Sequence, residues 1–176
     1  MELPLGVHRL DLDENPDIRG DLTELYRREW DTGLDPPQWN LARSKPGTLR
    51  GVHVHPMHDD YVVVLSGRLT IGLYDLRRGS PTVGCSALVA LSGDDLGALL
   101  IPRGVGHGSV HHESTNLLVG VTHYWGDPLD ELGCRWDDPD LGLDWPEQPT
   151  LITERDSTAP SLAGLLDVLE PWQPFL

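Results

Sequence analysis

Residues 50–60 read Arg-Gly-Val-His-Val-His-Pro-Met-His-Asp-Asp, and their spacing is the strongest structural signal in the chain. His53 and His55 lie two positions apart. Side chains at positions i and i+2 of a β-strand share one face, so the two imidazoles should point together, into a barrel or out of it. Arg50 has the opposite parity unless a bulge intervenes.

Short β-rich runs surround this stretch, and no long helical period interrupts residues 21–125. The clearest runs are residues 48–55, 61–65, 69–76, 85–91, 98–101 and 117–125. Residues 65–69 read as a hairpin in which Gly67 is free to take a positive φ. Turn signals about every 8–12 residues are typical of a closed all-β domain.

The length of 176 residues predicts one domain with a real core. We expect an N-terminal arm over residues 1–20, a barrel core over 21–125, and a wrapping segment with a C-terminal helix over 126–176. The helix is expected at 161–169, where leucines recur at helical spacing between prolines.

Composition narrows the classes of partner and compartment. A net charge of -15 without a basic stripe argues against nucleic acid. Because no apolar run of about 18 residues and no signal-peptide order occurs, we expect no membrane partner and a cytoplasmic protein. Cys85 and Cys134 are then expected to be free thiols.

The histidines also have the spacing of a known pair of motifs. His53 and His55, with Asp60 and Gly67 behind them, resemble the first cupin motif, and residues 102–107, Pro-x-Gly-x-x-His, resemble the second. The resemblance implies a cupin, or jelly-roll, β-barrel.

Three imidazoles and a carboxylate on inward faces could hold Zn, Fe, Mn or Ni. The ligands would be His53, His55, Asp60 and His107. The alternative is that these side chains hydrogen-bond inside a polar barrel without a metal.

Several segments, in one order and covering most of the chain, resemble the dTDP-4-dehydrorhamnose 3,5-epimerase family. They are Arg19-Gly20 before Glu24, Gln38-Trp-Asn40, Leu49-Arg-Gly-Val-His53, residues 75–82 and 101–108, Trp136-Asp-Asp-Pro139 and Glu154-Arg-Asp156. The resemblance implies a homodimer that needs no cofactor and acts on a nucleotide-linked 4-keto-6-deoxyhexose, whose ketone acidifies the neighbouring C3 and C5 hydrogens.

The family's residues carry over by position. His53 would be the base, Asp156 the carboxylate that orients it, and Tyr124 a pocket residue. The remaining residues would bind substrate, with the arginines on the diphosphate: Arg19, Arg50, Arg155, Glu24, Gln38, Asn40 and His107.

Three positions depart from the family. Val119 replaces the family's tyrosine acid, Asp60 lies where its active-site lysine maps, and His55 replaces a glutamine. Losing one acid or oxyanion donor typically costs about 10²–10³ in rate. Inversion at two carbons is therefore not expected by the family mechanism.

Three functions stay open on the sequence. The first is an epimerase or isomerase acting at one carbon, with Tyr124, His55, His58 or water returning the proton. The second is a metal-dependent oxygenase or lyase that uses the four ligands given above. The third is a sugar-nucleotide-binding cupin without activity.

Overall fold

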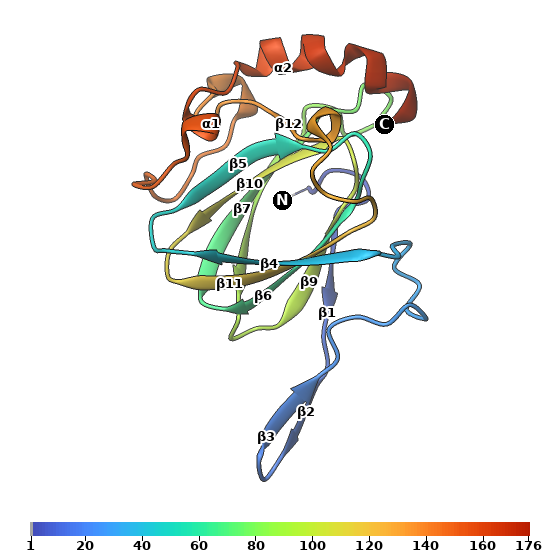
Figure 1. Ribbon diagram of the computed structural model, residues 1–176, viewed down its shortest axis with the longest axis vertical. Helices are drawn as coiled ribbons and strands as arrows, with labels where there is room; N and C mark the ends of the chain where they lie inside the picture. Colours follow the sequence, from blue (N-terminus) through green and yellow to red (C-terminus); the bar gives the residue numbers. More distant parts are fainter. Residues whose placement is uncertain (1) are drawn as a thin grey trace.

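The computed structural model describes residues 2–176 as two antiparallel β-sheets that face each other (Figure 1). The first sheet contains, in spatial order, β1 (His8–Asp11), β9 (Gly97–Ile101), β6 (Asp60–Ser66), β11 (Thr115–Val121) and β4 (Gln38–Ser44). The second contains β12 (Leu132–Gly133), β5 (Leu49–Val54), β10 (Val105–His111), β7 (Arg68–Asp75) and β8 (Ser86–Ser92). The predicted all-β, cupin-type jelly roll is confirmed.

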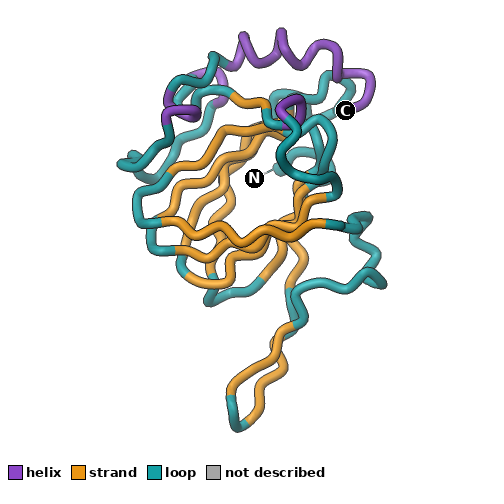
Figure 2. Tube along the Cα trace, in the orientation of Figure 1, coloured by secondary structure: helices purple, strands orange, loops and turns teal. Residues whose placement is uncertain are grey.

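The remaining elements lie outside the barrel. They are the hairpin of β2 (Glu14–Asp17) and β3 (Gly20–Thr23), and the helices η1 (Pro128–Asp130), η2 (Pro139–Leu141), α1 (Glu154–Ser157), α2 (Leu162–Leu169) and η3 (Glu170–Phe175). The predicted C-terminal helix is α2. Figure 2 shows the helices gathered at one end of the molecule. None of the helices in residues 2–176 has the length and apolarity needed to cross a bilayer.

Apolar side chains form three buried clusters, and two of them bear on the position of the functional site. One fills the space between the sheets, where Val64, Leu73 and Leu99 are almost completely buried. The other lies under the C-terminal helix, where Leu165 and Leu169 pack against the outer face of β5. Burying side chains of this size stabilises the fold by about 1.5–3 kcal/mol each. The C-terminal segment is therefore part of the folded core.

The expected boundary between arm and barrel at residues 20 and 21 differs from the structure. β1, which falls inside the expected arm, pairs with β9 over four residues. The hairpin of β2 and β3 instead projects away from the barrel (Figure 1). The strand β1 escaped the sequence analysis because Leu10 is the only apolar residue among its four.

Strand β4 was also missed, and the reason leads to the functional site. Gln38 and Asn40 alternate with the more exposed Trp39 and Leu41. Its polar side chains face the space between the sheets, which reverses the usual pattern of apolar residues inside. Polar residues inside a barrel require a reason other than packing.

Candidate active site

A cavity of about 420 Å³ opens between the two sheets. Its walls come from β4, β6, β9 and β11 on one side and from β5, β7 and β10 on the other. The segments that follow the barrel close its rim, contributing Trp125, Glu131 and the start of α1. A cavity of this size is large enough for a small-molecule ligand.

His53 and Asp156 form the most direct acid–base pair of the cavity. His53 Nε2 lies 2.7 Å from Asp156 Oδ1. Burial acts to raise the pKa of Asp156, but hydrogen bonds from His53 and Gly51 outweigh it and hold that pKa below its usual value. The ionised carboxylate accepts the Nε2 proton, so His53 Nδ1 keeps its lone pair as the basic nitrogen.

The backbone fixes both members of this pair. Thr153 caps α1, its hydroxyl accepting a hydrogen bond from the Asp156 backbone N–H at 3.2 Å. Asp156 Oδ2 accepts a further bond from Gly51 N–H at 3.3 Å. Gly51 has φ +110°, and a Cβ there would lie 2.6 Å from the Cα of Gly108. Glycine is therefore required for β5 to approach β10 and hold this geometry.

Two arginines, Arg50 and Arg155, supply positive charge to the cavity. Arg50 donates to Ser44 Oγ at 2.9 Å and to the Arg43 carbonyl at 3.2 Å, and it has no ion pair within residues 2–176. Arg155 pairs with Glu131 at 3.3 Å. Because both acceptors of Arg50 are neutral, its positive charge is not neutralised by them and can interact with an anionic ligand.

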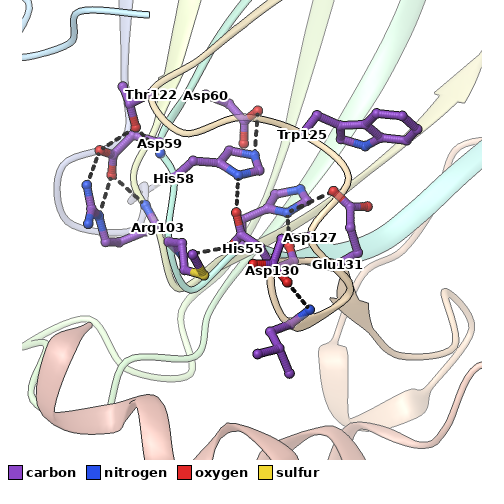
Figure 3. A network of polar contacts seen from close by, with 12 residues as sticks. His55, His58, Asp59, Asp60, Arg103, Thr122, Trp125, Asp127, Asp130 and Glu131 are labelled. Atoms are coloured by element: carbon purple, nitrogen blue, oxygen red, sulfur yellow. Dashed lines mark hydrogen bonds and ion pairs between the residues drawn. The ribbon is translucent and has the colours of Figure 1, made fainter. Parts of the chain in front are cut away.

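A second histidine cluster, shown in Figure 3, lies in the loop between β5 and β6. His58 Nδ1 is 2.5 Å from Asp130 Oδ2, and its Nε2 is 3.6 Å from Asp60 Oδ1. Burial acts to lower the pKa of His58, but the hydrogen bonds to Asp130 and Asp60 outweigh it and raise that pKa to about 9. His58 is therefore a buried cation at neutral pH.

His55 is its neutral neighbour. The His55 ring stacks on the His58 ring with centroids 3.9 Å apart, and its Nδ1 donates to the Asp130 carbonyl at 2.6 Å. Burial lowers the pKa of His55 to about 4. Its free nitrogen is then Nε2, on the side of Asp60 and His107.

The four predicted metal ligands do not come together as one set. His55, Asp60 and His107 have ligand atoms within 4.8 Å of one another, but His53 is bound to Asp156 instead. The nearby His58 cation already neutralises part of the Asp60 charge, which weakens the attraction for a divalent ion. The spacing of these three side chains would admit a metal, but His53 is not among the ligands and the adjacent His58 cation disfavours one.

The predicted substrate-binding residues divide into two groups. Asn40, Arg50, His107 and Arg155 line the cavity. Gln38 stands behind it, donating to Asn40 Oδ1 at 2.9 Å and accepting from the Trp125 backbone N–H at 3.1 Å.

Arg19, Glu24 and Tyr124 do not reach the cavity of their own chain. Arg19 pairs with Asp17 on the projecting hairpin, and Glu24 pairs with Arg27. Tyr124 is 66% exposed.

The wall position expected for Tyr124 belongs to its neighbour Trp125. The reason is that β11 ends at Val121, and strand parity no longer applies in the turn that follows. The turn is fixed by Gln38, which holds Trp125, and by Thr122, which bonds Asp59.

The sequence analysis missed several cavity residues, among them Ser109, Glu131 and Trp125. Ser109 lies on β10 two positions after His107, and its Oγ is 3.1 Å from His111 Nε2. The alternation that joined His53 to His55 could have found it. Glu131 carried no comparable signal, because it lies in an irregular loop.

The comparisons with known proteins agree with this geometry. The sequence profile described as dTDP-4-dehydrorhamnose 3,5-epimerase matches residues 3–164. The chain belongs to this family. The dTDP-4-dehydrorhamnose 3,5-epimerase of Sinorhizobium fredii is 32% identical, covering 85% of this chain and 81% of the relative. The dTDP-4-dehydrorhamnose 3-epimerase of Streptomyces niveus is also 32% identical, over 92% of this chain and 82% of the relative.

Solved structures of epimerases from the same family are similar over almost the whole chain. An epimerase from Mycobacterium tuberculosis superimposes with a TM-score of 0.86 at 28% identity, covering 99% of this chain and 96% of that one. A 3'-monoepimerase from Streptomyces bikiniensis in complex with dTDP-quinovose gives 0.84 at 28% identity, covering 97% and 95%. The resemblance inferred from ordered motifs is therefore confirmed as family membership.

Proposed function

We propose that this protein is an epimerase or isomerase that removes a proton next to the ketone of a nucleotide-linked 4-keto-6-deoxyhexose, at one carbon. The relatives named above act, by their names, on dTDP-linked 4-dehydro sugars. The observation that carries the proposal is the 2.7 Å contact between His53 and Asp156 on the wall of a ligand-sized cavity. A carboxylate that orients an imidazole is suited to general base catalysis near neutral pH.

Substrate binding follows from the charges around this pair. Arg50 and Arg155 would hold the diphosphate, because forked guanidinium groups match phosphate oxygens. Asn40 and His107 would bind the sugar, with Gln38 holding Asn40 in place. Trp125 offers an aromatic surface at the rim in the position that we had expected for Tyr124.

The experiment is solvent exchange. Purified protein is incubated in D₂O with dTDP-, UDP- and GDP-linked 4-keto-6-deoxyglucose, and deuterium at C3 and C5 is followed by NMR. We expect exchange at one carbon, and its loss in His53→Ala. Binding without exchange in any of these substrates would contradict the proposal and point to a sugar-nucleotide-binding protein.

The proposed reaction needs no cofactor, because the ketone itself acidifies the adjacent carbon. Prolonged dialysis against a chelator should leave the exchange rate unchanged. A rate that falls and then returns with one added divalent metal would instead favour the metal-dependent reading of His55, Asp60 and His107.

We also propose a homodimer in which the β2–β3 hairpin reaches the partner. The hairpin extends from the barrel, and Ile18 at its tip is fully exposed. Arg19, which the family resemblance assigns to substrate, lies on this hairpin away from its own cavity. Sedimentation should give a dimer, and Arg19→Ala should raise KM more than it lowers kcat. A monomer would contradict this proposal.

A cytoplasmic location completes the proposal. Cys85 and Cys134 are both free thiols, as is usual in a reducing compartment. Cell fractionation tests it, since recovery outside the cytoplasm would contradict it.

A further inference from the structure

Strand β5 contains an extra residue where it pairs with β10, and this residue decides which way Arg50 points. His107 pairs with His53 in the register of the two strands, and Ser109 pairs with Arg50. Between these two pairs β10 advances by two positions and β5 by three, which makes a β-bulge at Gly51, whose φ is +110°. Arg50 and His53, which simple alternation would put on opposite faces, therefore both line the cavity.

The cavity wall formed by β5 and β10 thus carries two rows of polar side chains. The first row is His53 with His107, and the second row is Arg50 with Ser109. Two residues of a strand span about 6.5–7 Å. In a nucleotide-linked hexose the phosphate on C1 lies at a comparable distance from the carbons beside the C4 ketone. When one of these carbons is at His53, the second row faces the phosphate.

Ser109 also begins a chain of hydrogen bonds that leads away from the cavity. Ser109 Oγ is 3.1 Å from His111 Nε2, and His111 Nδ1 is 2.5 Å from Thr115 Oγ1. His111 and Thr115 are buried, with 0% and 2% of their surface exposed. Burial lowers the pKa of His111 to about 4, and the charge of Arg50 acts in the same direction. The ring is therefore neutral at neutral pH and carries a single N–H.

The Thr115 hydroxyl determines which ring nitrogen carries that proton. A buried hydroxyl needs an acceptor for its hydrogen, and within the described part of the chain His111 Nδ1 is the one hydrogen-bonding contact of Thr115 Oγ1. Thr115 therefore donates to Nδ1. The ring proton is then on Nε2 and is donated to Ser109 Oγ. The hydrogen of the Ser109 hydroxyl is left to be donated into the cavity.

We propose that Ser109 is a substrate-binding residue whose hydroxyl donates a hydrogen bond to the phosphate on C1 of the sugar, beside the charge of Arg50. His111 and Thr115 are positioning residues that fix the direction of this hydrogen bond. The identity of the ligand rests on the proposed function. Hydrogen bonds to charged phosphate oxygens are among the strong ones, and Ser109 does not reach the reacting carbons, so its contribution is to binding.

The first test measures binding without turnover. Wild type, Ser109→Ala and Ser109→Thr are titrated in a calorimeter with inorganic pyrophosphate, dTDP, UDP and GDP. For the diphosphate that binds most tightly, Ser109→Ala should raise Kd about tenfold, and Ser109→Thr, which keeps the hydroxyl, should stay within about threefold of wild type. Thermal melting of both variants serves as the control for folding.

Three outcomes of this titration would contradict the proposal. An unchanged Kd in Ser109→Ala would mean that the hydroxyl makes no contact. Equal losses in the two variants would assign the effect to packing. Failure of wild type to bind any diphosphate would remove the ligand altogether.

Deuterium exchange separates this proposal from the proposed function. With the 4-keto-6-deoxyglucose carried on the same nucleotide, Ser109→Ala should raise KM about tenfold and keep kcat within about threefold. A loss in kcat alone would assign Ser109 to the reaction step and overturn the proposal. If wild type exchanges no deuterium while Ser109→Ala still weakens diphosphate binding, the proposed function fails and the Ser109 contact stands.

The direction of the hydrogen bonds is tested in the wild-type protein, so the result does not depend on how a variant folds. Proton–nitrogen correlation NMR of histidine-labelled protein should show His111 protonated on Nε2 and unprotonated on Nδ1. A proton on Nδ1 would mean that Nε2 accepts the Ser109 hydrogen and leaves none for the phosphate, which would overturn the proposal.

Discussion

Two of the histidine–carboxylate pairs of this molecule, His53–Asp156 and His58–Asp130, have the same composition and different surroundings. The His53–Asp156 pair stands at the cavity wall, where the His53 side chain keeps 23% of its exposure. The His58–Asp130 pair is sealed, with side chains 1% and 2% exposed. The first can exchange protons with a ligand. The second holds its proton, since the pKa of His58 is raised to about 9.

The difference teaches that the contact between imidazole and carboxylate does not by itself identify a catalytic base. At 2.5 Å, the His58–Asp130 contact is shorter than the 2.7 Å contact between His53 and Asp156. The open pair has a cavity on one side and a free ring nitrogen facing it, and the sealed pair has both nitrogens engaged by carboxylates. Whether the imidazole can reach a ligand in the cavity therefore decides whether the pair can act as a base.

The strongest test of this difference removes the His53 imidazole, which faces the cavity. His53→Asn should lower the rate of deuterium exchange about 10⁴-fold, because the base is lost. The melting temperature should change little, since His53 lies at a cavity. Exchange that persists at more than a tenth of the wild-type rate would mean that another group is the base.

Asp130→Asn makes the corresponding change in the sealed pair. Breaking a buried ion pair costs about 3–5 kcal/mol because it leaves an uncompensated charge. We expect that loss in the free energy of unfolding measured in urea. His58→Gln/Asp130→Asn, which removes both charges, should recover part of it. A single variant as stable as wild type would show that His58 is not charged in the folded protein.

Asp156→Asn should have an intermediate effect on activity. The amide no longer accepts the His53 Nε2 proton as an anion, so the imidazole loses its orientation and the stabilisation of its charged form. We expect kcat to fall about 10²–10³-fold with KM nearly unchanged. A rise in KM with kcat unchanged would instead assign Asp156 to substrate binding.

The pH dependence of stability should show the smallest effect. The folded pKa of His58, about 9, lies above its unfolded value of 6.5, so its stabilisation is complete below about pH 6.5 and is lost as the pH rises through about 9. The buried His55 has a folded pKa of about 4, below its unfolded value, so its contribution is lost as the pH falls from 6.5 toward 4. Thermal melting should therefore be highest near pH 6.5.

The His58→Gln variant is the control for this profile. It should flatten the decline between pH 6.5 and 9 while keeping the decline on the acid side. A variant that keeps the wild-type slope above pH 6.5 would assign that slope to another group.

Much of the barrel could be predicted from the sequence because β5 to β9 carry dense apolar runs separated by turn residues. Gly67 takes φ +77° in the predicted hairpin. The edge strands β1 and β4 could not be predicted in the same way. The side chains of β4 that face the barrel interior are mostly polar, and β1 has a single apolar residue. The position of each strand therefore depends on pairing with strands that are distant in the sequence.

The candidate site could also be predicted only in part. The family motifs brought out His53 and Asp156, which lie 103 positions apart, as a pair, and the structure has them in contact. Their catalytic roles stay a prediction. No motif pointed to Asp130, which reaches His58 across 72 positions. The alternation of residue types in a sequence identifies side chains that share a strand face. It does not identify contacts made by residues in irregular loops.

The segment after the barrel has a consequence for how the protein matures in the cell. Asp130 and Asp156 both come from this segment, and both bind histidines that precede residue 60. During synthesis the barrel strands leave the ribosome first. His53 and His58 are then present before Asp156 and Asp130, the carboxylates that they contact in the folded protein. If the proposed roles are correct, catalytic competence requires this segment, and because Leu165 and Leu169 also belong to the folded core, a nascent chain halted before α1 should neither complete the fold nor turn over substrate.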